Sequence, residues 1–162
     1  MRNIKLLLVL FWLVFTQVSF GQFSQIRFEK LDTRDGLSHN RVTSIYKDQL
    51  GFMWFGTRSG LNRYDGNSIK VIEHEDDNSF SLSDQNIVWI KEGPEGYLWI
   101  KSDYGVFAYD IYKESYVDIR PLLAELDINH YNLSVMVKDG LGNFWFVIDN
   151  IGVKKYLSDT KE

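Results

Sequence analysis

Apolar residues recur along the chain in short uninterrupted runs, and not in the alternating pattern of a strand with one solvated face. The clearest runs are FMWF at 52–55, YLWI at 97–100 and FWF at 144–146. A continuous apolar run of this length predicts a strand that is covered on both faces. Each run follows a polar tetrapeptide ending in glycine, namely DQLG, GPEG or DGLG. These tetrapeptides predict hairpin loops that need a residue with positive φ.

The three runs belong to a unit that recurs along the whole chain. Their tryptophans lie 45 and 46 residues apart, and glycines, a tyrosine and an apolar pair keep nearly constant spacings around each of them. The repeated residues are Gly51, Trp54, Gly60, Tyr64, Gly96, Trp99, Gly105, Tyr109, Gly142, Trp145, Gly152 and Tyr156, and the apolar pairs are Val42/Ile45, Ile87/Ile90 and Leu133/Met136. Spacings this regular predict a repeat protein.

Each unit has the length and turn pattern of one β-propeller blade. A second turn follows each apolar run, the next strand carries the tyrosine, and a more variable fourth strand is expected at 68–72 and 115–119. Four short strands in each unit are typical of a propeller blade. We therefore predict an all-β fold of about three four-stranded antiparallel blades in an incomplete ring. The predicted blades are residues 36–80, 81–126 and 127–162, the third incomplete, with the tryptophans packed between them.

The first residues predict export. Arg2 and Lys5 precede an apolar run at 6–15, and small residues at 19 and 21 fit a cleavage site. We predict a signal peptide at 1–21, cut between Gly21 and Gln22. An uncleaved membrane anchor is the alternative, but the run is shorter than the roughly 20 residues that a spanning helix needs. We expect residues 22–35 to form a lead-in strand that closes the last blade of a full propeller.

Composition changes this picture little. Aromatic residues make up 15% of the chain, which favours β structure. The net charge is −4, and it becomes −6 without the predicted signal peptide, which carries two basic residues and no acidic one. This acidity argues against nucleic-acid partners. The chain has no cysteine, so an exported form would be stabilised by packing alone.

The sequence contains no recognisable catalytic or metal-binding constellation. The three histidines share no ligand spacing, and the glycine-rich phrases lack the pattern of a phosphate loop. We therefore expect no catalytic residue, metal or cofactor. Ligand contacts are expected from variable turn residues, and the candidates are Arg58, Asp103 and Tyr104. Trp89 is a fourth candidate because it stands where the other two units have Ser44 and Val135.

One long segment resembles a known family. Residues 35–66, DGLSHNRVTSIYKDQLGFMWFGTRSGLNRYDG, followed by SFSLSDQNI at 79–87, resemble the start of the sensor region in Bacteroidetes-type hybrid two-component systems, which is built of two-component regulator propeller repeats. The family phrase of a D-x-x-G turn, a W-[IF]-G-T strand and a G-L-x-x-Y-D segment is almost complete at 48–65. Later units depart from it, with Lys101 and Val147 in place of Gly56 and with Gly93 in place of the turn aspartate.

The resemblance implies an exported sensor that detects polysaccharide fragments in the periplasm and controls genes for glycan uptake and breakdown through a histidine kinase. Its expected partners are an oligosaccharide bound at the propeller mouth, the remaining blades and downstream kinase of a full-length protein, and a second copy in a homodimer. The 162 residues contain no kinase motif, so we read the chain as a fragment of such a sensor and expect no enzymatic activity of its own.

Two other functions stay open at this point. An exported propeller enzyme, either a polysaccharide lyase or a glycoside hydrolase, would need a clustered acid–base pair that the sequence does not display. A stand-alone propeller could also serve as an interaction scaffold. Release of product from a glycan would indicate the enzyme, whereas binding without turnover would indicate the sensor.

Overall fold

The computed structural model describes residues 27–73, 82 and 86–158 of the chain. The chain divides into two units, Met1–Lys30 and Leu31–Glu162, and the fold below is that of the second. The predicted signal peptide and its cleavage site lie outside the described residues, as does most of the predicted lead-in strand. The described part of that stretch, residues 27–35, contains no strand.

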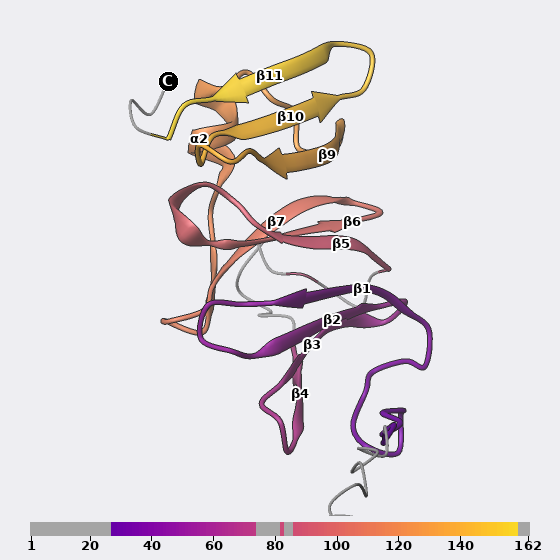
Figure 1. The fold of residues 1–162 in the computed structure, drawn as a ribbon. Helices are drawn as coiled ribbons and strands as arrows, with labels where there is room; N and C mark the ends of the chain where they lie inside the picture. The colour runs from indigo at the N-terminus through magenta and orange to yellow at the C-terminus, as the bar shows by residue number, and fades with distance from the viewer. Residues whose placement is uncertain (1–26, 74–81, 83–85, 159–162) are drawn as a thin grey trace, which may run out of the picture. The chain divides into compact units, whose positions relative to one another are not determined.

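Three antiparallel sheets follow one another along the chain (Figure 1). The first contains β1 (Val42–Lys47), β2 (Met53–Thr57), β3 (Gly60–Tyr64) and β4 (Ile69–Ile72). The second contains β5 (Ile87–Glu92), β6 (Leu98–Ser102), β7 (Gly105–Asp110) and β8 (Ser115–Val117). The third contains β9 (Leu133–Lys138), β10 (Phe144–Ile148) and β11 (Gly152–Tyr156). In each sheet every strand pairs with the next one in sequence. The predicted all-β blades are thus confirmed, and the described strands close no ring.

Two short helical segments interrupt the strands, and the sequence reading had not predicted either. A 3₁₀ turn, η1 (Pro94–Gly96), forms the first hairpin loop of the second blade. A six-residue helix, α2 (Arg120–Glu125), connects the second blade to the third. Proline near its first position suits a helix start, and Leu123 anchors it in the core between these blades.

The hairpin glycines have the predicted backbone conformation. Gly51, Gly96 and Gly142 have φ values of 93°, 75° and 89°. A Cβ at any of the three would meet no atom within 4 Å. Glycine is therefore required by the left-handed conformation itself and not by lack of space.

Tryptophans fill the space between adjacent blades. Trp54 is fully buried between the first and second blades, where its ring meets that of Tyr109 edge-on at 5.6 Å. Trp99 is fully buried between the second and third blades, 5.9 Å from the ring of Phe146. The predicted packing between blades is confirmed for these two tryptophans.

Gly56 lies where the first two blades pack closely together. A Cβ at this position would lie 2.5 Å from Cγ2 of Ile87, on the first strand of the second blade. The glycine of the W-F-G-T phrase is therefore needed for space. The equivalent position in the second blade is Lys101, whose ammonium reaches out to the backbone carbonyl of Tyr131 at 3.1 Å.

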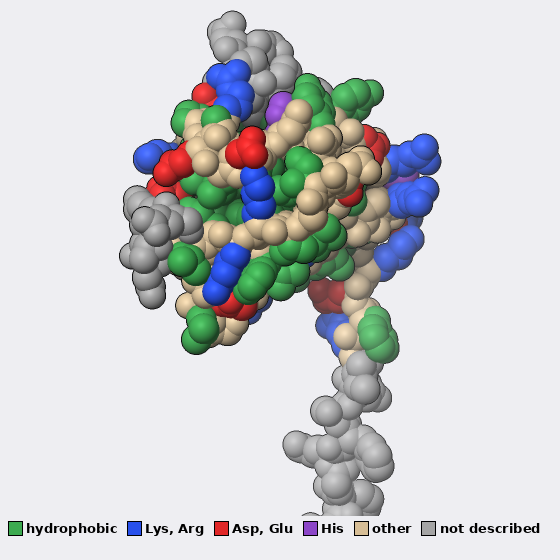
Figure 2. Space-filling view, turned by 90° about the horizontal axis from the view of Figure 1, so that it is seen from above, with side chains coloured by type: hydrophobic (Ala, Val, Ile, Leu, Met, Phe, Trp, Pro, Cys, Tyr) green, Lys and Arg blue, Asp and Glu red, His purple; other side chains and the backbone are tan. Residues whose placement is uncertain are grey.

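The third repeat tryptophan does not follow the prediction. Trp145 is 39% exposed, because no described strand covers the face of the third blade on which it lies. The same face carries Val135, Val137 and Val147, all at least partly exposed. Figure 2 looks down on the third blade and shows hydrophobic side chains gathered there, with basic and acidic groups both among them and toward the margins. Packing between blades was thus the wrong expectation for Trp145.

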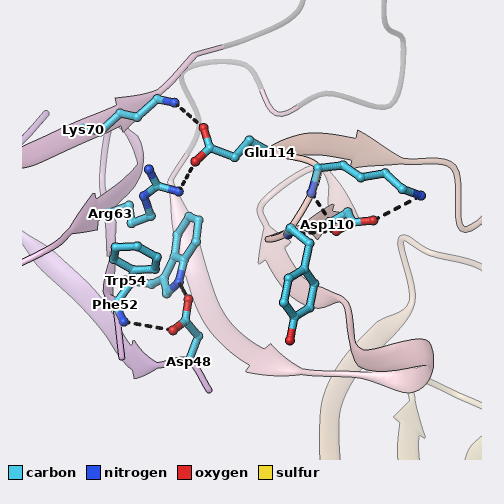
Figure 3. A network of polar contacts seen from close by, with 9 residues as sticks. Asp48, Phe52, Trp54, Arg63, Lys70, Asp110 and Glu114 are labelled. Carbon is cyan, nitrogen blue, oxygen red and sulfur yellow. Dashed lines mark hydrogen bonds and ion pairs between the residues drawn. The ribbon is translucent and has the colours of Figure 1, made fainter. Parts of the chain in front are cut away.

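An aspartate in the first hairpin loop holds the tryptophan of its blade (Figure 3). Asp48, which is buried, accepts the indole N–H of Trp54 at 2.7 Å and the backbone N–H groups of Leu50 and Phe52, each at 2.9 Å. Asp139 repeats the arrangement in the third blade, where its Oδ2 accepts the Trp145 indole N–H at 2.9 Å. This bond is the main cause that lowers the pKa of Asp139 to about 2.

The second blade lacks this aspartate for a steric reason. A Cβ at Gly93 would lie 2.2 Å from the Trp99 ring, so the ring occupies the space that a side chain would need. Among the described residues the Trp99 indole N–H has no hydrogen-bond acceptor. Glycine replaces the turn aspartate at position 93 because the Trp99 ring lies where the aspartate side chain would be.

Charged side chains join the first blade to the second (Figure 3). Glu114, in the turn between β7 and β8, accepts hydrogen bonds from Lys70 at 2.8 Å and from Arg63 at 2.7 Å. These bonds, that of Lys70 first, lower the pKa of Glu114 to about 2. Glu92 and Lys138 form a similar bridge, 2.7 Å long, between the second blade and the third.

Candidate functional site

At one end of the three blades, the same backbone hydrogen bond recurs in each blade. In each blade the turn between the second and third strands donates an N–H to the segment that enters the first strand. The bonds run from Arg58 to Arg41 at 3.2 Å, from Asp103 to Asn86 at 3.3 Å and from Asp149 to Asn132 at 2.9 Å. We call this region, residues 38–41, 57–60, 86, 102–105, 129–132 and 148–152, the turn end.

Side chains brace the turn end differently in each blade. In the second blade the Asn86 amide donates to Asp103 Oδ1 at 3.2 Å. In the third blade the Ser134 hydroxyl donates to Asp149 Oδ1. The backbone scaffold is therefore constant while the side chains vary, as is common where rigid frames present variable loops for binding.

The first blade carries a buried polar network at this end. The backbone N–H of Ser38 donates to Asn62 Oδ1 at 2.8 Å, and the Asn62 amide donates to the Ser38 hydroxyl at 2.9 Å. The Thr57 hydroxyl lies 2.8 Å from the same serine oxygen. Asn62 and Thr57 are fully buried, so the network fixes the turn before Arg58 and has a structural role.

The structure places three of the four predicted ligand residues at the turn end. Arg58, Asp103 and Tyr104 are all exposed there, Tyr104 with 66% of its surface. Trp89 lies apart from them on β5, half-buried between the second and third blades. Its indole N–H donates to the Ser134 carbonyl at 2.9 Å, so the residue already braces two blades. Ligand binding by all four stays a prediction.

A loop that sequence reasoning overlooked packs against the turn of Asp103 and Tyr104. His130 lies over Gly105, where an added Cβ would approach its Cδ2 to 2.6 Å. The Tyr131 ring follows, with its centroid 3.9 Å from that of His130. Lys101 holds the loop through the Tyr131 carbonyl. The replacement of a repeat glycine by Lys101 was the one signal that could have indicated this contact.

Burial and charge act together on the ionisable groups of this loop. Burial is the main cause that lowers the pKa of His130, and the positive charges of Lys101 and Arg120 lower it further. Burial also lowers the pKa of Lys101, opposed by the negative charges of Asp149 and Asp103. The loop therefore presents hydrogen-bonding groups beside the exposed ring of Tyr131.

Two further features of the described residues bear on the site. No group of three or more His, Cys, Asp or Glu side chains among them lies close enough to hold a metal ion. No helix in the described part of the chain has the length and apolar character needed to cross a membrane.

Comparison with known proteins gives a repeat family that matches part of the chain, and a similar fold. Residues 36–59 match the family described as two component regulator propeller. A histidine kinase from Formosa agariphila is 35% identical over 83 residues, which is 51% of this chain and 6% of that kinase.

Solved structures give the fold. The extracellular domain of BT3049, named as a hybrid two component system of B. thetaiotaomicron, aligns with a TM-score of 0.62 at 24% identity, over 82% of this chain and 19% of that one. The extracellular domain of BT4673, another system of that organism named in the same way, aligns with a TM-score of 0.62 at 24% identity, over 87% and 18%. The chain thus spans only a small part of each of these relatives.

Proposed function

We propose that this chain is part of the ligand-sensing propeller of an exported sensor, because residues 36–59 match the two component regulator propeller repeat. The sensor would act through a histidine kinase outside these residues. The observation that carries the proposal is the family match at residues 36–59, in a blade whose variable turn residue Arg58 stands on the backbone bond shared by all three blades.

The ligand that we propose is an oligosaccharide derived from a polysaccharide, bound in the periplasm. The turn end supports this choice because it offers exposed aromatic rings beside polar groups, among them the amide of Asn86 that donates to Asp103. Tyr104 and Tyr131 are both largely exposed there. Aromatic side chains combine apolar area with a polar tip, and ligand sites place a few oriented polar groups beside such area. Binding would shift the blades or subunits relative to one another and change the activity of the kinase, which would control genes for glycan use.

A direct test incubates the full chain, secreted by an expression host, with a panel of plant and algal oligosaccharides. We expect at least one of them to raise the unfolding temperature without any release of product. A folded chain that no member of the panel stabilises would contradict the proposal, and release of shortened products would indicate a propeller enzyme instead.

The chain offers a matched pair of variants for locating the site. Tyr104 and Tyr112 have the same exposed fraction, 66%, and they flank the two ends of β7. We expect Tyr104→Ala to reduce the stabilisation by the glycan and Tyr112→Ala to leave it unchanged. Equal effects of the two substitutions would remove the turn end from the proposal.

A further inference from the structure

A cavity of about 230 Å³ opens beside the turn end, between β7 and the connection from the second blade to the third. Its walls come from β7, the end of β8, the start of α2 and the loop of His130 and Tyr131. It therefore joins residues of the second blade to the segment that leads into the third, and none of the residues predicted as ligand contacts lines it.

The floor of the cavity is apolar. Val106, Ile119 and Leu123 line it, and all three are almost fully buried in the core between the blades. The volume is below the roughly 300–1,000 Å³ typical of sites for drug-sized ligands. The cavity thus has room for one small ring with at least one apolar face.

The rim of the cavity is polar, and two of its charged side chains already form an ion pair. Arg120 and Asp118 form a two-pronged ion pair, with Nε to Oδ1 at 2.9 Å and Nη2 to Oδ2 at 3.0 Å. Both side chains line the cavity and remain partly exposed. Tyr131, 61% exposed, and His130 complete the rim.

This combination selects among classes of ligand. An anion would gain little from Arg120, whose charge Asp118 already balances. A wholly apolar ligand would bury the ion pair and the His130 ring without replacing their bonds to water, which is costly. A sugar ring meets both surfaces, because its C–H face can lie on apolar or aromatic groups while its hydroxyls bond to a planar charged pair.

We propose that this cavity binds one neutral hexose ring, as the end unit of the oligosaccharide that the sensor detects. The inference rests on the proposed function for the class of ligand, and it adds the site and the uncharged character of the bound unit. A ring in the cavity would contact the second blade and the connection to the third at once. Lys154 of the third blade ties this connection by donating to the carbonyls of Leu126 at 2.9 Å and Asp127 at 2.8 Å.

The test uses saturation-transfer NMR on the full chain with free glucose, galactose, mannose and N-acetylglucosamine, and with glucuronate and inorganic phosphate as charged probes. We expect transfer to at least one neutral hexose. Tyr131→Ala and Arg120→Ala should each weaken its binding at least fivefold. Tyr112→Ala, which removes an exposed tyrosine at the opposite end of the blade, should leave binding unchanged. Unfolding temperatures of the variants confirm that each chain is folded.

Several outcomes overturn the inference, and they differ from those that overturn the sensor. Absence of transfer to every hexose, equal binding by all variants, or binding of only the charged probes would each exclude a neutral sugar in this cavity. If an oligosaccharide still stabilised the chain, the proposed function would stand without this site. If a hexose bound as expected but the chain released products from glycans, the cavity would stand and the sensor would not.

Discussion

Removal of the Asp48 carboxylate tests how a blade holds its tryptophan. In Asp48→Ala the indole N–H of Trp54 loses its acceptor at 2.7 Å at a fully buried position. A buried donor without a partner costs about 1–3 kcal/mol. The backbone N–H groups of Leu50 and Phe52 also lose an acceptor, but they lie at a loop that water reaches and should add about 1 kcal/mol together. We expect the free energy of unfolding to fall by about 3 kcal/mol.

Asp139→Ala is the matched control because it removes the three equivalent bonds from the third blade, together with one further bond from the Asn143 side-chain amide at 3.2 Å. Asp139 accepts from Trp145 at 2.9 Å and from the backbone N–H groups of Leu141 and Asn143. Trp145 is 39% exposed, so water can replace the lost acceptor. We expect the Asp139→Ala loss to be less than half of the Asp48→Ala loss.

The assay is urea unfolding of the full chain and both variants at pH 7, followed by tryptophan fluorescence. Stability is compared through the midpoint at constant slope, since an altered slope would indicate a changed unfolded state or an intermediate. Equal losses in the two variants would refute the reasoning, because burial of the indole would then not decide the cost. No loss in Asp48→Ala would refute the role of the carboxylate itself.

Three other predictions concern separate parts of the chain. Glu114→Gln should destabilise the chain at pH 7, while Glu73→Gln, an exposed control next to β4, should not. Because the folded-state pKa of Glu114 is lowered to about 2, its contribution is complete above the unfolded value near 4.3 and is lost as the pH falls toward 2. Denaturation midpoints of wild type and Glu114→Gln should therefore converge over that range, and a constant gap would contradict the assignment. Gly56→Ala should cost about 1–3 kcal/mol by overpacking against the second blade, whereas Gly140→Ala, where a Cβ meets no atom within 4 Å, should change the urea midpoint little. The secreted chain should begin at Gln22 by mass spectrometry, and retention of residues 1–21 would favour the membrane anchor.

Much of the fold followed from local patterns in the sequence. The repeat spacing around Trp54 and Trp99 located the strands, and the glycines before them located the hairpins. These features depend on neighbouring residues along the chain, since strand pairing in a meander joins segments that are adjacent in sequence. The helix α2 was missed because six residues are too few for a helical period to stand out from a loop.

The exposure of Trp145 could not be predicted from the repeat spacing. Its sequence context resembles those of Trp54 and Trp99, but burial of a strand face depends on what lies against it. Val42 and Ile45 show the same effect on the first blade, where both are exposed although their equivalents Ile87 and Ile90 are buried. Position in the array, and not residue type, decided these exposures.

The candidate site, too, was predicted in part from the sequence and decided in part by the tertiary structure. The sequence by itself identified the repeat, the resemblance to two-component regulator propellers and the variable turns with Arg58, Asp103 and Tyr104, because turn chemistry and repeat spacing are local. Only the tertiary structure brought the loop of His130 and Tyr131 against the Asp103 turn, engaged Trp89 between blades, and formed the cavity behind Arg120. These contacts join residues of different units, and their geometry depends on how neighbouring blades pack, which no single repeat encodes.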